Sequence, residues 1–98
     1  MTNNDEKIIA IVGAKDKVIR SLGTGKYVGD EIPPADIGGF NLRVPNPKIE
    51  LDSGKVVWGC ECWWGYEKSM LEQIEHWKAK GYEVEIVDID DVRKEVND

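Results

Sequence analysis

The sequence of 98 residues lacks several features that would assign it to a common functional class. Its longest apolar run is the five residues from Ile8 to Val12, which is too short for a membrane-spanning helix or for the core of a signal peptide. Residues 1–6 also lack the positive charge expected ahead of such a core. We therefore expect a cytoplasmic protein that does not insert into a membrane.

Cysteine and histidine are scarce, with only Cys60, Cys62 and His76. Two cysteines in an i, i+2 relation along a strand are poorly placed to bond to each other, so reduced thiols are expected. The three residues are one ligand short of a structural zinc site, unless an acidic residue or a second chain supplies the fourth. A nucleophilic thiol needs electropositive surroundings, whereas Glu61 would raise the pKa of a nearby thiol. We predict no metal site, no cofactor and no thiol chemistry.

No motif for nucleotide binding or catalysis is complete. In the glycine-rich stretch 21–29, Tyr27 occupies the Ser/Thr position of a Walker loop, and the first glycine of that loop is missing. The glycines are spaced G-x-G-x-x-x-G, which differs from the dinucleotide fingerprint. We find no Ser-His-Asp set, so an enzyme is not expected. As an alternative function, backbone N–H groups in this turn could hold an anionic or nucleotide ligand. The residues that would bind it are Gly23, Thr24, Gly25, Lys26 and Arg43.

The net charge of −6 is concentrated near the C-terminus. Residues 82–98 hold seven acidic and two basic side chains, a balance of −5, whereas residues 1–81 hold 12 acidic and 11 basic ones, a balance of −1. A chain with this charge is disfavoured on phosphate backbones and on anionic membranes. The acidic segment either keeps the protein solvated or attracts a basic partner.

The hydrophobic pattern predicts a single domain over residues 1–98 with the order β-β-loop-β-β-α-β. We expect a small α+β fold with a mixed sheet of about five strands and one amphipathic helix packed on one face. The predicted hairpins are Lys7–Gly13 with Lys17–Leu22, and Lys48–Leu51 with Lys55–Trp63, followed by a helix over Glu67–Lys80 and a strand over Tyr82–Ile89.

The remaining segments are predicted to be irregular. Residues 23–47 contain all four prolines and five of the ten glycines, which indicates a long ordered loop with one short strand over Phe40–Val44. Residues 1–6 are expected to be flexible. Residues 90–98 are expected to form either a short helix capped by Asp90 and Asp91 or a frayed tail.

Aromatic residues gather between Lys55 and Gly65, where three of the four tryptophans lie. In one continuous strand, Val56, Trp58, Cys60, Cys62 and Trp64 would face the core, and Trp63 would face the other way. Tryptophan and tyrosine dominate the energetics of protein interfaces. We therefore predict that a protein partner binds through Trp63, Trp64, Tyr66, Ile32 and Phe40. The alternative is that Trp63 packs beneath the long loop.

The leading expectation is thus a non-enzymatic module that binds a protein partner, rather than nucleic acid or a membrane. In its small size, acidity and tryptophan content the chain resembles accessory proteins of phages and mobile elements, although no motif carries this resemblance. The alternative is a small-ligand binder that uses residues 23–29. Edge strands would also allow copies of the chain to pair into a homo-oligomer.

Overall fold

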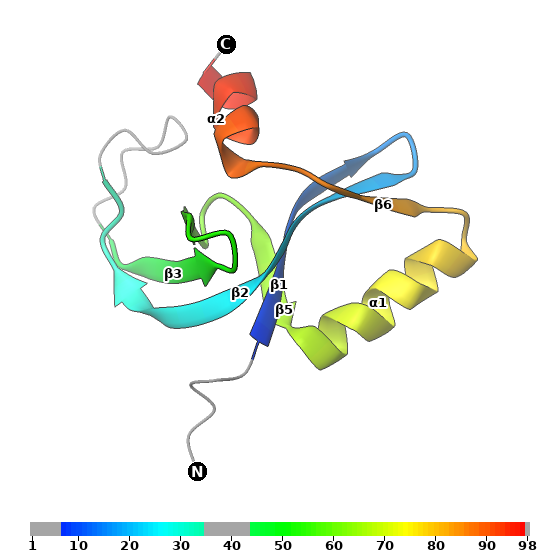
Figure 1. The fold of residues 1–98 in the computed structure, drawn as a ribbon, viewed down its shortest axis with the longest axis horizontal. Helices are drawn as coiled ribbons and strands as arrows, with labels where there is room; N and C mark the ends of the chain where they lie inside the picture. Colours follow the sequence, from blue (N-terminus) through cyan, green and yellow to red (C-terminus); the bar gives the residue numbers. More distant parts are fainter. Residues whose placement is uncertain (1–6, 35–43, 98) are drawn as a thin grey trace.

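The computed structural model describes residues 7–34 and 44–97. Within these ranges the chain forms six strands and two helices (Figure 1). They are β1 (Lys7–Lys15), β2 (Val18–Glu31), β3 (Asn46–Leu51), β4 (Val56–Trp58), β5 (Trp63–Tyr66), α1 (Glu67–Ala79), β6 (Glu83–Ile86) and α2 (Ile89–Asn97). No helix among the described residues is long and apolar enough to cross a membrane.

The strands form one mixed sheet in the order β4-β3-β2-β1-β5, with β6 paired to β2. Every pair is antiparallel except β2 with β6, which is parallel. Strand β2 is long enough to take two neighbours on the same side, because β6 pairs with its start and β3 with its end. The α+β class and the mixed sheet are therefore confirmed.

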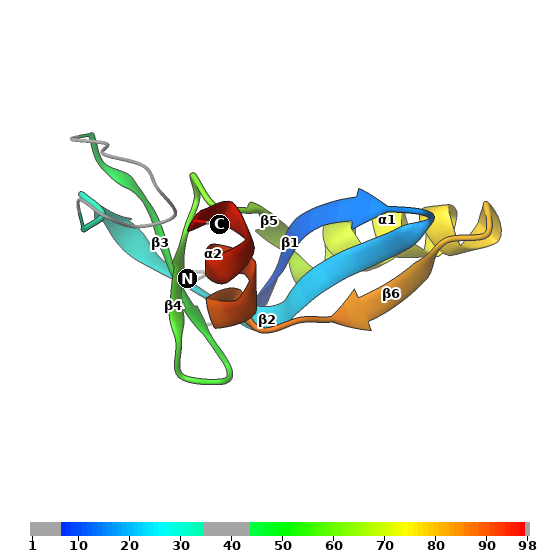
Figure 2. The same ribbon diagram turned by 90° about the horizontal axis from the view of Figure 1, so that it is seen from above.

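Hydrophobic residues on β1 alternate between the two faces of the sheet, as the period of a strand requires. Ile8 and Ala10 belong to a cluster with β3, β4 and α2, whereas Ile9 and Ile11 belong to a cluster with α1. The two helices consequently lie on opposite sides of the sheet (Figures 1 and 2). The prediction of one helix on one face is thus incomplete, because the C-terminal residues form α2 and cover the second face.

The β1–β2 hairpin is irregular at its centre. The register shifts on both sides of Ile11, which marks a β-bulge. The buried Ser21 side chain satisfies polar groups there, since its hydroxyl donates to the Ala10 carbonyl (3.2 Å) and accepts from the Gly23 N–H (3.0 Å). Such a bulge increases the local twist of the hairpin, which helps the sheet to wrap around its two clusters.

The predicted loop over residues 23–47 is wrong at both ends. β2 continues through residues 23–31, and Asn46 already belongs to β3. A Cβ atom on Gly25 would lie 2.6 Å from the Glu50 carbonyl oxygen, so glycine here permits close pairing of the two strands instead of breaking the strand. Val44 lies in a bend, and the rest of the predicted strand Phe40–Val44 lies outside the described residues.

The predicted continuous strand Lys55–Trp63 is also wrong. It is divided into β4 and β5 by a tight turn over residues 59–62, in which the Glu61 N–H donates to the Trp58 carbonyl (2.8 Å). A side chain at Gly59 would collide with Pro47, with a Cβ–Cδ distance of 2.7 Å. The predicted alternation of faces fails as well, since Val57 is fully buried and Cys60 is only partly buried.

The C-terminal elements agree better with the prediction. The predicted helix over Glu67–Lys80 is confirmed as α1, and Gly81 after it has a φ of 95°. Strand β6 is shorter than predicted because α2 begins at Ile89. The α2 N-terminus is capped by Asp88, whose carboxylate accepts from the Asp90 N–H (2.8 Å), and not by Asp90 and Asp91 as predicted, because these two residues already belong to the first turn.

Candidate functional site

An apolar cavity of about 160 Å³ lies between the β1–β2 hairpin and the C-terminal end of α1. Every residue that lines it is uncharged, and three of them are aromatic. The lining residues are Ile11, Gly13, Ala14, Ile19, Trp63, Trp77 and Tyr82.

The lengths of the strands create this cavity. Strand β1 continues to Lys15, but β5 pairs only with its residues 8–11. Beyond that point β1 contributes Gly13, which has no side chain, and Ala14, which has only a methyl group, and both line the cavity. The far wall is formed by Trp77 and Tyr82, which the end of α1 holds together through a hydrogen bond from the Tyr82 N–H to the Trp77 carbonyl (3.1 Å).

Trp63 stands at the margin of the cavity and is 70% exposed. It pairs in register with Ile11, on the face of the sheet that α1 covers. The alternative that Trp63 packs beneath the long loop is therefore wrong. An indole exposed to this extent beside an apolar hollow is unusual for a solvated surface, because large aromatic rings gain free energy when they are buried.

Trp64 and Tyr66 point to the opposite face from Trp63. Trp64 is partly buried, stacks on Tyr27 with ring centroids 5.1 Å apart, and packs against the cluster around Ile8. Tyr66 meets Trp64 edge to face at 6.3 Å and is 43% exposed. The structure thus separates Trp63 from the two aromatic residues with which it was predicted to act.

The other predicted partner-binding residues lie elsewhere. Ile32 is exposed, but it follows the end of β2 that is opposite to the hairpin and the cavity. Phe40 lies outside the described residues. Sequence reasoning missed Trp77 and Tyr82, because an apolar residue on a helix stripe or on the inward face of a strand is expected to be buried in the core. The small pair Gly13-Ala14 at the end of a hydrophobic strand was the available signal.

The residues of the alternative ligand site lie in a strand rather than in a turn. Residues 23–26 pair with β1, and Gly25 and Lys26 also pair with β3. The Thr24 hydroxyl donates to the Asp52 carboxylate, and the Thr24 carbonyl accepts from the Asp52 N–H (2.9 Å). Arg43 lies outside the described residues. Backbone groups engaged in two strand pairings cannot form the predicted cradle for an anion.

The cysteines are poorly placed for chemistry. Burial, with a contribution from Glu61, raises the pKa of the Cys62 thiol to about 12. The same two causes raise the pKa of the Cys60 thiol. His76 lies on the exposed side of α1, and no group of three or more metal-binding side chains occurs in residues 7–34 and 44–97.

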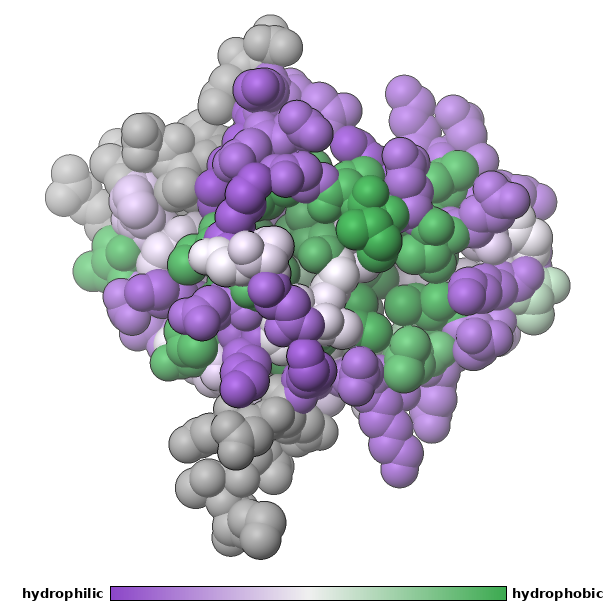
Figure 3. Space-filling model, viewed as in Figure 1, coloured by the Kyte–Doolittle hydropathy of each residue, from purple (hydrophilic) through white to green (hydrophobic). Residues whose placement is uncertain are grey.

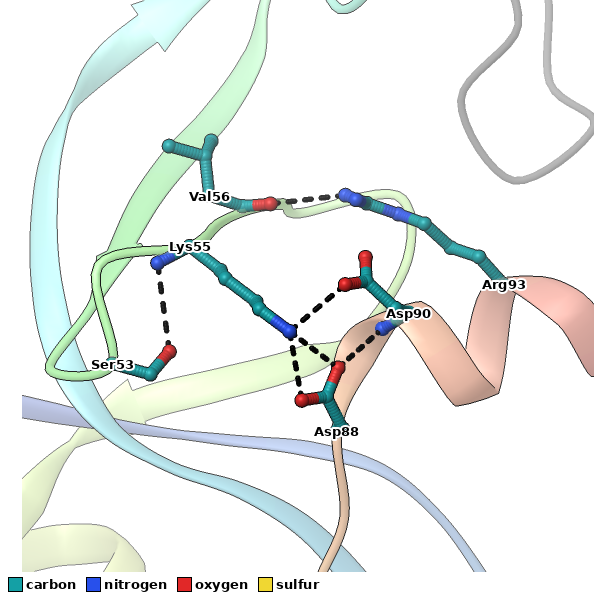
Figure 4. A network of polar contacts seen from close by, with 6 residues as sticks. All are labelled: Ser53, Lys55, Val56, Asp88, Asp90 and Arg93. Carbon is teal, nitrogen blue, oxygen red and sulfur yellow. Dashed lines mark hydrogen bonds and ion pairs between the residues drawn. The ribbon is translucent and has the colours of Figure 1, made fainter.

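A charged network anchors α2 beside the β3–β4 hairpin (Figure 4). The Lys55 ammonium donates to Asp88 at 2.8 and 2.9 Å and to Asp90 at 2.8 Å. The hydrogen bond to Asp88, and to a smaller extent the hydrogen bond to Asp90, raise the pKa of Lys55 to about 12. These charges satisfy one another, so we assign the network to the attachment of α2 and not to ligand binding.

Hydrophobic side chains also gather over β6 and the adjoining part of α1 (Figure 3). Ile86 and Leu71 are the exposed large apolar residues of these two elements. This surface lies on the same face of the sheet as the cavity, but neither Ile86 nor Leu71 lines the cavity.

Comparisons of the chain with protein-family models, with curated proteins and with solved structures found no match.

Proposed function

We propose that this protein is a non-enzymatic binding module that takes an apolar side chain of a protein partner into the cavity beside Trp63. The observation that carries the proposal is the 70% exposure of Trp63 at the margin of an uncharged hollow. Exposed tryptophans beside well-packed pockets are typical hot spots of protein interfaces. Such a module, small and acidic, would suit an accessory role like that of proteins in phages and mobile elements.

The size and the lining of the cavity favour a side chain over a small-molecule ligand. Pockets for such ligands have volumes of roughly 300–1,000 Å³ and contain a few placed polar groups. Here the volume is about 160 Å³, and the side chains that line the cavity offer only indole N–H groups and the Tyr82 hydroxyl. An anionic or nucleotide ligand would find no positive charge among these residues. We further infer a cytoplasmic location, which the unpaired Cys60 and Cys62 support.

The test is a selection of peptides from a random display library on the immobilised protein, repeated on variants. We expect peptides with a large apolar residue to bind the wild type and to lose at least about tenfold in affinity on Trp63→Ala, as hot-spot truncations do. Ala14→Leu, which fills the cavity while Trp63 stays in place, should weaken the same peptides. Ile32→Ala is the matched control, because it removes an exposed apolar side chain far from the cavity. Peptides that bind Trp63→Ala as well as the wild type would refute the proposal.

A further inference from the structure

The sheet has three outer strands, and the backbone edge of β4 is closed by side chains. The Arg93 guanidinium donates to the Val56 carbonyl (2.9 Å), and the Trp58 N–H donates to the Glu61 carboxylate (3.1 Å). The Trp58 carbonyl accepts from the Glu61 N–H (2.8 Å). No strand can add to β4 without breaking these bonds.

Strand β6 is protected in another way. It has only four residues, and two of them are Glu83 and Glu85. Short length and charged side chains are the usual means by which natural edge strands avoid pairing with other chains. Strand β5 is equally short, with four residues, but it lacks the second means of protection. Its residues Trp-Trp-Gly-Tyr carry no charge.

The pairing pattern shows which backbone groups of β5 point outward. The Asp52 N–H donates to the Thr24 carbonyl, so the backbone N–H and carbonyl of Thr24 point toward β3. Those of the next residue, Gly25, point toward β1. In an antiparallel pair, hydrogen-bonding residues alternate along each strand. Gly25 is opposite Ile8, so the backbone groups of Ile8 bond to β2. The backbone groups of the next residue, Ile9, therefore point toward β5.

Ile9 is opposite Gly65, so the backbone groups of Gly65 bond to β1. The backbone N–H and carbonyl of Trp64 and the backbone N–H of Tyr66 therefore point away from β1, at the open edge of the sheet. The Tyr66 carbonyl already belongs to the start of α1, because Tyr66 is the N-cap residue. No backbone hydrogen bond from the Trp64 or Tyr66 N–H to a turn or loop is found among the residues that the structure describes.

We propose that a second copy of this chain pairs with this edge, with β5 antiparallel to the partner's β5 about a two-fold axis through Trp64. Trp64 and the partner's Trp64 then exchange two N–H···O=C bonds. The Tyr66 N–H of each chain reaches the Cys62 carbonyl of the other. The pairing satisfies every outward group of β5 without change to the bonds that face β1.

Side chains support this register. A two-fold axis perpendicular to the sheet keeps each side chain on its own face, so Trp63 stands opposite the partner's Gly65. The space that a Cβ atom on Gly65 would take is filled by Met70, whose Sδ lies 3.0 Å from that position, so the indole would rest on Met70 of the partner subunit. The exposed ring of Trp63 thereby meets an apolar surface that the same sequence provides.

The charges beside this edge are paired within each chain. Strand β5 carries none, and the acidic side chain that precedes it, Glu61, is bound by Arg93 of α2. The pairing also places the cavities of both chains on one face of a continuous sheet.

Sedimentation velocity tests the pairing with a matched pair of variants. Tyr66 has φ −65° and ψ 144°, which proline adopts without strain, and its N–H points outward. Tyr66→Pro therefore removes one edge donor, whereas Tyr66→Ala removes the same ring and keeps the donor. The measurement covers concentrations from about 10 μM to about 1 mM, where the Kd values of weak pairs lie. Over this range the average mass of the wild type and of Tyr66→Ala should rise toward twice the 11.1 kDa of one chain. Tyr66→Pro should associate at least tenfold more weakly.

Amide hydrogen exchange at Trp64 gives a second readout that does not depend on the proline variant. Its N–H should be protected in concentrated wild-type protein and should exchange rapidly after dilution. A monomer throughout the concentration range, or equal association of Tyr66→Pro and Tyr66→Ala, would overturn the pairing. Because neither readout uses a ligand, peptide binding by a chain that stays monomeric would defeat this inference and leave the proposed function intact.

Discussion

At the scale of single residues, the β1–β2 turn requires Lys17 to adopt a backbone conformation that is unusual for a residue other than glycine. Asp16 and Lys17 have φ values of 54° and 64°, so both lie in the left-handed region. Positive φ at both positions matches the twist of a two-residue hairpin turn, and Asn-Gly or Asp-Gly is the preferred sequence. Asp16 fits this preference, whereas Lys17 carries a Cβ atom where glycine would be unstrained.

We predict that Lys17→Gly stabilises the protein by about 0.5–1 kcal/mol. Glycine removes most of the steric cost of the left-handed conformation, and this gain is partly offset because glycine raises the conformational entropy of the unfolded chain. Urea unfolding followed by tryptophan fluorescence measures this difference. Lys17→Ala is the control, since it removes the charged side chain and keeps the Cβ atom, and it should leave stability nearly unchanged. A gain in Lys17→Ala that equals the gain in Lys17→Gly would attribute the effect to charge.

The candidate site was predicted in part at this scale. Trp63 was identified because its position on a strand placed an aromatic ring outside the expected core, and its exposure agrees with that argument. Trp77 and Tyr82 were not identified, because an apolar stripe on a helix predicts burial and says nothing of a gap in the packing. That gap depends on how far β1 extends beyond β5, a difference in length that no local pattern encodes.

At the scale of elements, local periodicity predicted β1 and α1 well, because each has a pattern of its own. The continuation of β2 through its glycines was missed, since it depends on the close approach of β3, which begins 15 residues after β2 ends. The division between β4 and β5 was missed for a similar reason. Glu61 turns back to cap Trp58 and pairs with Arg93 of α2, a contact between residues 32 apart in the sequence.

The pair Arg93–Glu61 should contribute strongly to stability. Arg93 donates to both Glu61 oxygens at 2.8 and 2.9 Å, and the Glu61 side chain is only 5% exposed. Arg93→Ala would leave a buried carboxylate and an unpaired Val56 carbonyl, so we expect a loss of about 3 kcal/mol. The free energy of unfolding in urea measures this loss.

Arg20 provides the matched control for Arg93, because it also ties α2 to the sheet through an ion pair, with Glu95 at 2.6 Å. The Glu95 side chain is 57% exposed, and exposed pairs contribute about 0–1 kcal/mol. Arg20→Ala should therefore cost much less than Arg93→Ala. Similar losses in the two variants would show that attachment of α2 matters and that the buried charge does not.

At the scale of the whole molecule, one sheet separates two hydrophobic clusters that share its strands. Ile49 and Val57 belong to the cluster with α2, and Ile19 and Ile74 to the cluster with α1. Adjacent residues of β1 contribute to both. Loss of β1 would therefore expose both clusters at once, which couples the two sides of the sheet more tightly than their separate helices suggest.

We predict that the chain unfolds in one cooperative transition, and 5-fluorotryptophan labelling can test this by NMR. Trp64 packs against the cluster with α2, and Trp77 packs against the cluster with α1, so the two resonances report on the two sides of the sheet. Because β1 supplies Ile8 to one cluster and Ile9 to the other, both resonances should lose native intensity at the same urea concentration. A lower midpoint for Trp77 would mean that α1 leaves the sheet before the β3–β4 side unfolds, and the shared strand would then not couple the clusters.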